Sequence, residues 1–352
     1  MTIESPVSPQ HRGRPGLVAV KVEGKEGIGE LFGYDVILKT PEDRDFVPGE
    51  AADIDLDGWI GQEARLEIEL EGSGFAAGSG AGQSGGESGR GAGIREINGL
   101  IAEACFLREE GRHVFYRITL KPWLHLATLT SDCKIYQDVT VVELLDALLS
   151  DYGYPVEKRL TGSYPRRDYQ TQYDETDYVF FCRLCEEWGI QWYFEHRDGA
   201  HRLVLIDEMS AYQKNRSAAY WDIPFHALGD KIDEEYIHAF VAARRIVPGR
   251  YVTRDYDYTR PKSELETRQD DPRPTAHGGE EIYEWHAATS GGSHYAQPKA
   301  GPGQESNHPE EEGGRLARLR MESLRSPGHR ARGAGQLRGL LPGHVFTLRG
   351  HP

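Results

Sequence analysis

The sequence has few cysteines and no long apolar run, and each shortage excludes a class of protein. Only four cysteines occur in 352 residues (Cys105, Cys133, Cys182 and Cys185), too few and too scattered for a disulfide scaffold. No window approaches about 18 consecutive apolar residues, so we expect no membrane-spanning helix. Residues 1–15 are polar and proline-rich, without the basic end and apolar run of a signal peptide. We therefore expect folding in a reducing cytoplasm and, if the protein is exported, a route that uses no signal peptide.

Positive charge is also scarce over most of the chain. There are 41 Lys and Arg residues against 56 Asp and Glu, a net charge of −15, which argues against general binding to nucleic acids or anionic membranes. Residues 313–352 reverse the balance with eight arginines and one acidic residue, +7, which leaves −22 on the first 312 residues. This basic segment either contacts an acidic surface, of the chain itself or of a partner, or forms a solvated face.

Abundant glycine (41) and proline (19) favour turns and short strands. Alternation of apolar and polar residues predicts a first β-barrel domain over residues 17–125, most clearly at 64–70. Residues 1–16 are predicted to be disordered. Residues 72–93 contain ten glycines, and such a tract buries too little apolar area to order itself. We therefore predict a flexible insertion there, at a hairpin tip.

In residues 126–209 the spacing of the apolar residues changes from that of a strand to that of a helix. We predict a helix-containing α+β insert there. Thr140 followed by Glu143 has the form of a capping box and predicts a helix start. A second helix is predicted from about Thr176 to Trp188, and Asp198-Gly199 is typical of a hairpin turn between two strands.

Residues 210–352 return to a β-rich pattern and predict a second β-barrel domain. Residues 261–279 and 289–314 are expected to be surface loops, 315–325 a short basic helix, and 343–348 a final strand. The predicted fold is therefore mainly β, with two barrel domains separated by the α+β insert.

Several short motifs match catalytic or metal-binding patterns without their structural context. Gly82-Gln83-Ser84-Gly85-Gly86 matches G-x-S-x-G, and Gly80, Gly82 and Gly85 match G-x-G-x-x-G, but neither has the flanking strand and helix that its chemistry needs. Cys182 and Cys185 form a CxxC without a second ligand pair, and both fall on the apolar stripe of the predicted helix. We interpret them as core residues, with a metal or redox role as the alternative.

Two other groups leave alternatives open. His277, His286 and His294 lie in a loop-rich region, where convergence would give a metal or hydrolase site. Arg330 to Gly339 has the composition of an RNA-binding tract but no interleaved aromatics for base stacking, so pairing with neighbouring carboxylates or carbonyls is favoured. No nucleophile, base and carboxylate occur in recognisable spacing. We therefore predict no catalytic, cofactor-binding or metal residue and no cofactor, and expect a non-enzymatic protein.

A set of segments in fixed order carries a resemblance to a known family. They are Glu30-Leu31-Phe32-Gly33-Tyr34-Asp35-Val36, Asn98-Gly99, Leu120-Lys121-Pro122-Trp123-Leu124, Asp132-Cys133-Lys134-Ile135-Tyr136-Gln137, Tyr164-Pro165-Arg166-Arg167-Asp168-Tyr169, Cys185-Glu186-Glu187-Trp188-Gly189-Ile190, Glu195-His196, Ala242-Ala243-Arg244-Arg245, Arg254-Asp255-Tyr256-Asp257-Tyr258 and Leu340-Leu341-Pro342-Gly343-His344. In this order they resemble the VgrG tip proteins of type VI secretion and, more loosely, the late control gene D proteins of phage tails.

The resemblance implies a structural role in a larger assembly. Two similar β-barrel domains per chain, as in phage baseplate hub proteins, would form a homotrimer with pseudo-six-fold symmetry. Such a ring would cap the Hcp tube hexamer, contact baseplate components and attach a spike, a PAAR-type tip or an effector. The protein would be cytoplasmic during assembly and then secreted by the type VI machinery. No nucleic acid or stable membrane insertion is implied.

The sequence departs from the family pattern in its 72–93 insertion and in Cys182 and Cys185. We also expect the spike domain to be absent, since the chain reaches Pro352 where a spike would begin. Two alternatives to the secretion hub remain. One is a baseplate hub of a phage tail or tailocin, and the other is a hydrolase whose site is built from distant residues.

Overall fold

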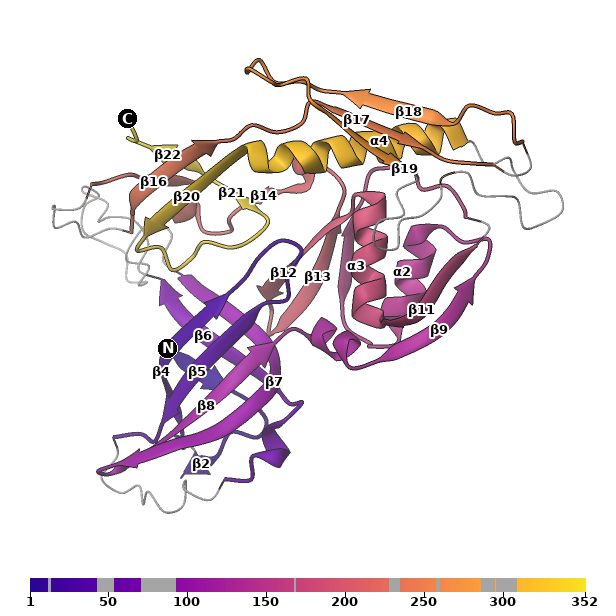
Figure 1. The fold of residues 1–352 in the computed structure, drawn as a ribbon. Helices are drawn as coiled ribbons and strands as arrows, with labels where there is room; N and C mark the ends of the chain where they lie inside the picture. The colour runs from indigo at the N-terminus through magenta and orange to yellow at the C-terminus, as the bar shows by residue number, and fades with distance from the viewer. Residues whose placement is uncertain are drawn as a thin grey trace, which may run out of the picture.

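The protein consists of a curled sheet, a helix-containing insert and a C-terminal unit that lies across both (Figure 1). The computed structural model describes residues 1–11, 14–42, 54–70, 93–167, 169–227, 235–257, 260–285, 295 and 309–352. The predicted Gly-rich insertion at 72–93 therefore lies, apart from Gly93, outside the described residues. The mainly β prediction with a helix-containing insert is confirmed.

A six-stranded antiparallel sheet forms the first unit, in the order β1-β6-β7-β8-β5-β4. Its strands are β1 (Thr2–Glu4), β4 (Val18–Lys25), β5 (Gly33–Lys39), β6 (Glu63–Leu70), β7 (Gly93–Glu110) and β8 (His113–Lys121). Strands β2 (Gln10–His11) and β3 (Arg14–Pro15) pair beside it, and the 3₁₀ helix η1 (Asp57–Trp59) follows β5. The edge strands β1 and β4 contact each other, so the sheet curls toward a barrel.

Alternation along the strands fills the interior of this unit. In β8 every second side chain is buried, namely Val114, Tyr116, Ile118 and Leu120. Side chains of successive strand residues point to opposite faces, so the period-two pattern read from the sequence places one row in the interior and the other, half-buried, on the outer face.

The N-terminus differs from the sequence-based expectation of disorder. Thr2–Glu4 pairs with Glu67, Leu66 and Arg65 of β6. The physical reason is burial, because Ile3 is only 7 % exposed and joins the core of the sheet. A single apolar residue among polar neighbours was too weak a pattern to predict this strand.

The insert packs two helices against short sheets. Its elements are η2 (Trp123–Thr128), β9 (Ser131–Tyr136), α2 (Val141–Ser150), β10 (Val156–Arg159), β11 (Gln170–Thr176), α3 (Asp177–Trp188), β12 (Gln191–Arg197) and β13 (Ala200–Ile206). Strand β9 pairs with β11, and β13 lies between β10 and β12. One continuous apolar core extends from Ile3 through both helices to Leu205, so the first unit and the insert are fused by apolar burial.

Local signals in the insert are confirmed. The Thr140 hydroxyl accepts the backbone N–H of Glu143, and the Glu143 carboxylate accepts the backbone N–H of Thr140. Asp198 and Gly199 both have positive φ, at 56° and 73°, as a tight hairpin turn requires.

The C-terminal unit consists of small sheets and one long helix. Its elements are η3 (Met209–Ala211), β14 (Gln213–Lys214), η4 (Ala218–Tyr220), β15 (Asp222–Pro224), β16 (Ile237–Arg244), β17 (Arg250–Arg254), β18 (Glu266–Asp270), β19 (Glu281–Trp285), α4 (Pro309–Arg325), η5 (Ser326–Gly328), β20 (His329–Gly335), β21 (His344–Val345) and β22 (Thr347–Arg349). Strand β17 lies between β18 and β19, and the pairs are β14-β21, β15-β22 and β16-β20. The equivalence of this unit with the first barrel stays a prediction.

Helix α4 is longer than the predicted 315–325, and β18 lies inside the predicted loop 261–279. Gly313 and Gly314 favoured a loop in the sequence, but in the structure they permit close packing. A Cβ on Gly313 would lie 2.7 Å from Thr267 Oγ1 of β18, so only glycine lets the helix lie this near the sheet.

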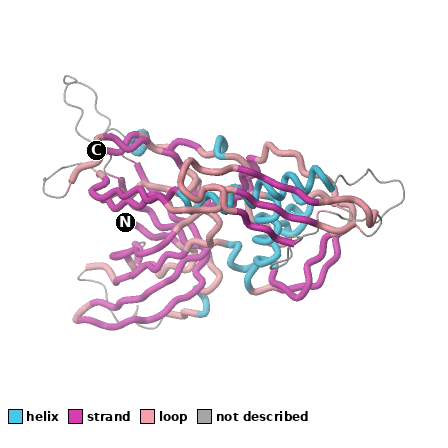
Figure 2. The backbone as a smooth tube through the Cα atoms, turned by 45° about the horizontal axis from the view of Figure 1, so that its top comes forward, coloured by secondary structure: helices cyan, strands magenta, loops and turns pink. Residues whose placement is uncertain are grey.

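The tube view shows the helices gathered on one side of the molecule and the strands of the first unit on the other (Figure 2). Among the described residues, no helix is long and apolar enough to cross a membrane. The main apolar core includes no residue of the C-terminal unit, and two small apolar clusters lie within that unit, Leu265, Tyr295 and Leu316 in one and Tyr251, Ala317 and Met321 in the other. The attachment of that unit to the rest of the chain therefore depends on other contacts.

Candidate functional site

The three units meet at the end of the first sheet, where β7 contacts the hairpin β12–β13. The C-terminal segment reaches the same place, because Arg95 Nη1 of β7 donates a hydrogen bond of 2.7 Å to the Arg338 carbonyl. This three-way junction is the candidate functional site, since the relative placement of the units is decided there.

Two buried histidines join the insert to the first sheet. His196 and His201 face each other across the β12–β13 hairpin. His196 Nδ1 accepts the backbone N–H of Asn98 at 2.9 Å, and His201 Nε2 accepts the backbone N–H of Trp123 at 2.8 Å. Burial lowers the pKa of each histidine to about 3, with Arg95 and His196 respectively adding to the effect. Both rings are therefore neutral near pH 7 and act as hydrogen-bond acceptors.

A polar network lies beside His196. The carboxylate of Glu26 accepts hydrogen bonds from the Tyr34 hydroxyl and from Arg95 Nη2, the latter at 3.1 Å. His196 Nε2 lies 3.6 Å from Glu26 Oε1. Burial and the Glu26 charge raise the pKa of Tyr34 well above its usual range, so the phenol stays protonated and donates.

This combination contains an acid, a base and a cation but no nucleophile. The His196 nitrogen that would act as a base already accepts a backbone hydrogen bond. The centre of its ring lies 4.8 Å from the ring centre of Phe32. The geometry favours a structural joint over general acid–base chemistry, which needs an available proton acceptor.

A cavity of about 610 Å³ lies between the first unit and the C-terminal segment. The lining residues include Glu26, Ile28, Arg95, Leu341, His344 and Phe346. The two units therefore meet along an incompletely filled seam rather than through a close-packed core.

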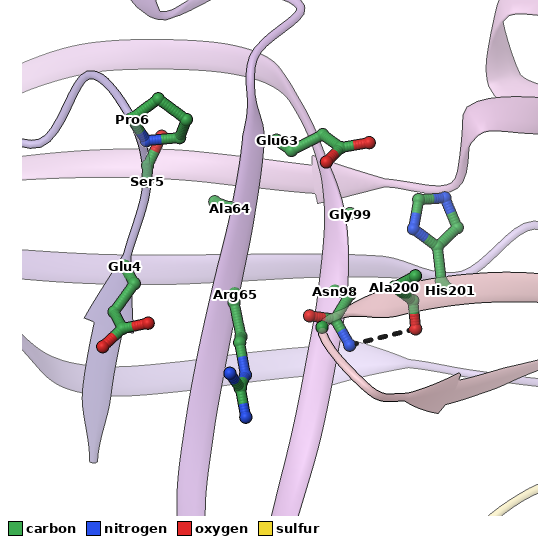
Figure 3. A pocket seen from close by; sticks show the side chains of 11 residues that line it. Glu4, Ser5, Pro6, Glu63, Ala64, Arg65, Asn98, Gly99, Ala200 and His201 are labelled. Atoms are coloured by element: carbon green, nitrogen blue, oxygen red, sulfur yellow. Dashed lines mark hydrogen bonds between the residues drawn. The ribbon is translucent and has the colours of Figure 1, made fainter. Parts of the chain in front are cut away.

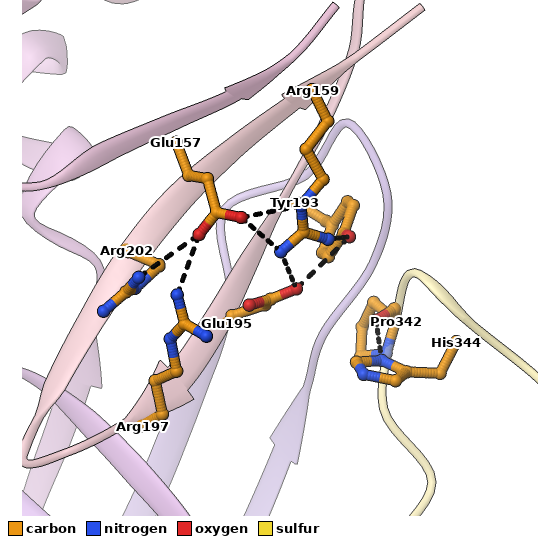
Figure 4. Close-up of polar contacts among 8 residues, drawn as sticks. All are labelled: Glu157, Arg159, Tyr193, Glu195, Arg197, Arg202, Pro342 and His344. Atoms are coloured by element: carbon orange, nitrogen blue, oxygen red, sulfur yellow. Dashed lines mark hydrogen bonds and ion pairs between the residues drawn. The ribbon is translucent and has the colours of Figure 1, made fainter. Parts of the chain in front are cut away.

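A group of paired charges covers one face of the sheet β10-β13-β12 next to this seam (Figure 4). The Glu157 carboxylate accepts hydrogen bonds from Arg197 Nη2 at 2.8 Å and from Arg202 Nη1 at 3.2 Å. Arg159 bridges the two acids, with Nε 2.8 Å from Glu157 Oε1 and Nη2 2.8 Å from Glu195 Oε1. Three arginines and two glutamates leave this face with one net positive charge.

The C-terminal segment touches this face through Gly343. Its backbone has φ of 72°, and a Cβ there would lie 2.3 Å from the ring of Tyr193. Tyr193 in turn accepts a hydrogen bond of 2.8 Å from Arg159 Nη1. Burial, aided by Glu195, raises the pKa of Tyr193 to about 12, which keeps its hydroxyl neutral.

Helix α4 is attached to the insert by a second polar joint around Trp188. The guanidinium carbons of Arg315 and Arg167 lie 3.9 and 4.7 Å from the Trp188 ring centre. Arg167 is 5 % exposed and pairs with Glu187 at 2.5 Å and with Glu312 at 3.6 Å. Burial, with the nearby Arg167 charge, lowers the pKa of Arg315.

The two CxxC cysteines lie where the packing interpretation places them. Cys185 is 2 % exposed and belongs to the main core, and Cys182 packs against it. Burial raises the pKa of both thiols, with the thiolate-favouring Tyr178 contact too weak to offset it at Cys182. Both stay protonated and apolar in character. Within the described ranges, no three His, Cys, Asp or Glu side chains are placed to hold a metal ion.

The remaining motif residues do not converge on the junction. His277 is exposed, 3.5 Å from Glu280, while His286 and His294 lie outside the described residues. The G-x-S-x-G tract at 82–86 also lies outside them. The arginine tract forms strand β20, paired with β16, and Arg338 lies 3.9 Å from Glu235.

No local pattern identifies His196, His201, Glu26, Arg95, Arg315 and Glu312 as joint residues. Several residues of the joints lie in segments that carry the family resemblance, but the resemblance assigns them no contact: Tyr34, Asn98, Trp123, Arg167, Glu187, Trp188, His196 and Gly343. The partners are far apart in the chain, and no local spacing reports a pair such as Asn98 with His196.

Comparison with known proteins gives a consistent result. The sequence model of the phage tail baseplate hub (GPD) family matches residues 25–352. Two Pseudomonas aeruginosa proteins, type VI secretion system spike proteins VgrG1b and VgrG1a, are each 30 % identical to this chain. The alignments cover 94 % and 96 % of this chain but 39 % and 45 % of those proteins. The chain thus spans less than half the length of these two relatives.

A solved structure supports the fold. The tail protein from Neisseria meningitidis superimposes with a TM-score of 0.50 at 10 % identity, over 94 % of this chain and 78 % of that one. At this identity the similarity concerns the arrangement of the backbone alone.

Proposed function

This chain belongs to the phage tail baseplate hub (GPD) family, and from that membership we propose that it is the structural hub of a type VI secretion tip. In this role it forms a homotrimer, caps the hexameric Hcp tube, contacts baseplate components and attaches a spike, a PAAR-type tip or an effector. The observation that carries the proposal is the family match over residues 25–352, joined to 30 % identity with two spike proteins.

Symmetry gives the proposal a physical basis. A trimer can cap a six-fold tube only if each chain presents two equivalent units. In this proposal those units are the β-rich parts at 17–125 and 210–352, on either side of the insert. Their strands would supply the surface that meets the tube.

The joints suit a part that bears force without catalysing a reaction. The first unit and the insert share one apolar core. The C-terminal unit is held to them by the hydrogen bond from Arg95, by the packing of Gly343 on Tyr193 and by the contact of Arg315 with the ring of Trp188. Buried charged groups that keep their partners specify one arrangement of packed elements. We propose a non-enzymatic role in which sheath contraction drives these joined units as one body.

The same proposal gives a location. The protein assembles in the cytoplasm and leaves the cell with the tip, through the type VI machinery and without a signal peptide.

The test uses purified protein with and without Hcp. Light scattering on a size-exclusion column should give the mass of three chains, and negative-stain images with Hcp should show rings seated on tube ends. A monomer that persists in the presence of Hcp and of a spike protein, with no measurable affinity for Hcp, would contradict the proposal.

A phage tail or tailocin baseplate hub is the second candidate, and the family name and the Neisseria tail protein favour it. Deletion of the gene separates the two. Loss of Hcp from the culture medium supports secretion, whereas loss of induced tail particles with unchanged Hcp release supports the phage role.

A further inference from the structure

Strands β16 and β20 form a two-stranded ribbon beside the end of helix α4 (Figure 1). All seven residues of β20 are exposed, and so are Ala239 and Val241–Arg244 of β16. In the described part of the chain, no third strand pairs with β20. A two-stranded ribbon is marginally stable by itself and normally needs a further strand or a packed face. The ribbon therefore presents a surface that another polypeptide can cover.

This ribbon is strongly basic. It carries four arginines and no acidic residue, the arginines being Arg244, Arg245, Arg330 and Arg332. None of them has an ion pair with a described residue, and Arg330 donates a hydrogen bond of 3.1 Å to Ser326 Oγ. Residues directly opposite each other in an antiparallel pair share a face, so Arg332 lies beside Val241. Val241 is 66 % exposed, and the face thus combines positive charge with an exposed apolar side chain.

The first sheet carries the opposite charge on its outer face. On β1, β6 and the start of β7 this face holds five glutamates and one arginine, namely Glu4, Glu63, Glu67, Glu69, Glu96 and Arg65. Figure 3 shows Glu4 of β1 beside Arg65 of β6. Arg65 pairs with Glu67 and Glu96. The other three glutamates have no ion pair with a described residue.

The basic ribbon and the acidic face complement each other. Four arginines against no acid give the ribbon a charge of +4, and five glutamates against one arginine give the sheet face −4. Each surface also has an exposed apolar side chain, Val241 on the ribbon and Ile94, 57 % exposed, opposite Glu69 on the sheet. Between described residues, no hydrogen bond or ion pair joins the two surfaces within one chain. A second copy of the chain supplies the surface that each one lacks.

Two other occupants of the ribbon fit less well. Pairing of two β20 strands would place arginines against arginines, which is destabilising. A nucleic acid would match the charge but would leave Val241 without an apolar contact. Strand β20 has no aromatic side chain for base stacking, and the net charge of −15 on the chain repels a polyanion.

We propose that the basic ribbon β16–β20 of one copy docks on the acidic outer face of β1, β6 and β7 of a second copy. The ribbon arginines pair with the carboxylates of Glu4, Glu63 and Glu69, and Val241 packs near Ile94. This contact rests on the proposed homotrimer. Each copy has one ribbon and one acidic face, so the contact is head-to-tail and repeats from copy to copy until the ring closes.

The test reverses the charges on each surface and measures self-association of the full chain by sedimentation equilibrium at low ionic strength. Arg330→Glu with Arg332→Glu should weaken association at least tenfold, and Glu63→Lys with Glu69→Lys should do the same, because each places like charges across the contact. All four substitutions together restore opposite charges. They should return the association constant to within about threefold of the wild-type value. Misfolding of either double variant would not be repaired by the other pair of substitutions.

Lys262→Glu with Arg318→Glu is the matched control. Both residues are exposed cations of the same unit outside the ribbon, and their reversal should change association less than twofold. Thermal unfolding of every variant separates loss of the contact from loss of the fold.

The outcomes distinguish this contact from the trimer itself. A wild-type trimer that both reversed double variants retain would overturn the contact and leave the proposed trimer standing. A wild-type monomer in the presence of Hcp and a spike protein would contradict the trimer and the contact together. Weakening without recovery in the fourfold variant would assign the ribbon to an acidic surface of another protein.

A fluorescent 20-nucleotide RNA tests the remaining occupant. We expect no saturable change in its anisotropy at chain concentrations that give the trimer. RNA binding that Arg330→Glu with Arg332→Glu abolishes, with self-association unchanged, would assign the ribbon to nucleic acid and overturn the proposal.

Discussion

The guanidinium of Arg315 stacks on the ring of Trp188 at 3.9 Å, which joins helix α4 of the C-terminal unit to the end of helix α3 in the insert. Trp188 is 4 % exposed and receives Arg167 as a second cation. Both guanidinium groups therefore contact the same ring, and the carboxylates of Glu187 and Glu312 lie near enough to compensate their positive charges. The joint is therefore a complete charge cluster, in which removal of one member leaves the others buried and uncompensated.

Replacement of Arg315 by Met should destabilise the protein by about 2–4 kcal/mol, because it removes a cation–π contact and unbalances a buried cluster. Urea unfolding followed by Trp fluorescence measures the change. Arg318→Met is the control on the same helix, since Arg318 is 63 % exposed and its 3.9 Å pair with Glu322 is solvated. It should cost less than about 0.5 kcal/mol. Equal effects of the two substitutions would contradict a buried joint.

A methyl group at position 343 should loosen the C-terminal segment. Gly343→Ala places a Cβ at 2.3 Å from the Tyr193 ring and at a φ of 72°, and we expect a loss of about 2–4 kcal/mol. Gly350→Ala shares the positive φ of 75° but has its nearest atom at 3.6 Å. It should cost only about 1 kcal/mol. Limited proteolysis should cut the Gly343→Ala chain first within residues 338–352, and wild-type protection there would argue against the contact.

The buried histidines should make the free energy of unfolding depend on pH. A histidine in the unfolded chain has a pKa near 6.5, whereas burial lowers those of His196 and His201 to about 3 in the fold. Between these values the unfolded chain binds protons that the folded chain does not. The contribution is therefore complete above about pH 6.5 and is lost as the pH falls toward 3. For each histidine this makes the free energy of unfolding on the order of 5 kcal/mol higher at neutral pH than below pH 3.

His196→Asn with His201→Gln keeps hydrogen-bond acceptors but removes both titrating groups. We expect this double variant to be less stable at pH 7, because ring packing is lost, yet to lose less further stability between pH 6 and pH 4 than the wild type. Unfolding free energies from urea titrations at each pH measure this slope. His329→Gln changes an exposed histidine on β20 and should leave the slope as it is. An unchanged slope in the double variant would exclude the buried pair as its source.

The capping box of α2 should contribute a small, local stabilisation. Thr140→Ala removes the acceptor for the Glu143 N–H and should cost about 1 kcal/mol, while Thr140→Ser keeps the hydroxyl and should cost less than half of that. Differential scanning calorimetry resolves the two. Identical melting temperatures for Ala and Ser would mean that packing of Leu144 and Leu148, rather than the cap, begins this helix.

Elements with local determinants were predictable. The capping box at Thr140 and the Asp198-Gly199 turn are confirmed, because each depends on residues within a few positions of one another. The strands around Leu66 and Ile118 follow from alternation of period two. The cysteines of α3 pack as their position on the apolar stripe predicts.

Elements that depend on distant partners were not predictable. Strand β1 exists because Ile3 finds a place beside β6, and the first turns of α4 exist because Gly313 finds close contact with Thr267. In each case the local sequence favours loop or disorder. The free energy that overrides this preference comes from a surface contributed by another part of the chain.

The sequence by itself determined the mainly β architecture, the helical insert, the absence of a recognisable catalytic motif and the family to which the chain belongs. Periodicity, capping and turn residues act over a few positions, so a linear pattern reports them. Only the tertiary structure decided which charges are buried together and where the units join. His196 with Asn98 and Trp188 with Arg315 are separated by about 100 residues or more. Their pairing depends on burial, which arises only when distant segments pack together.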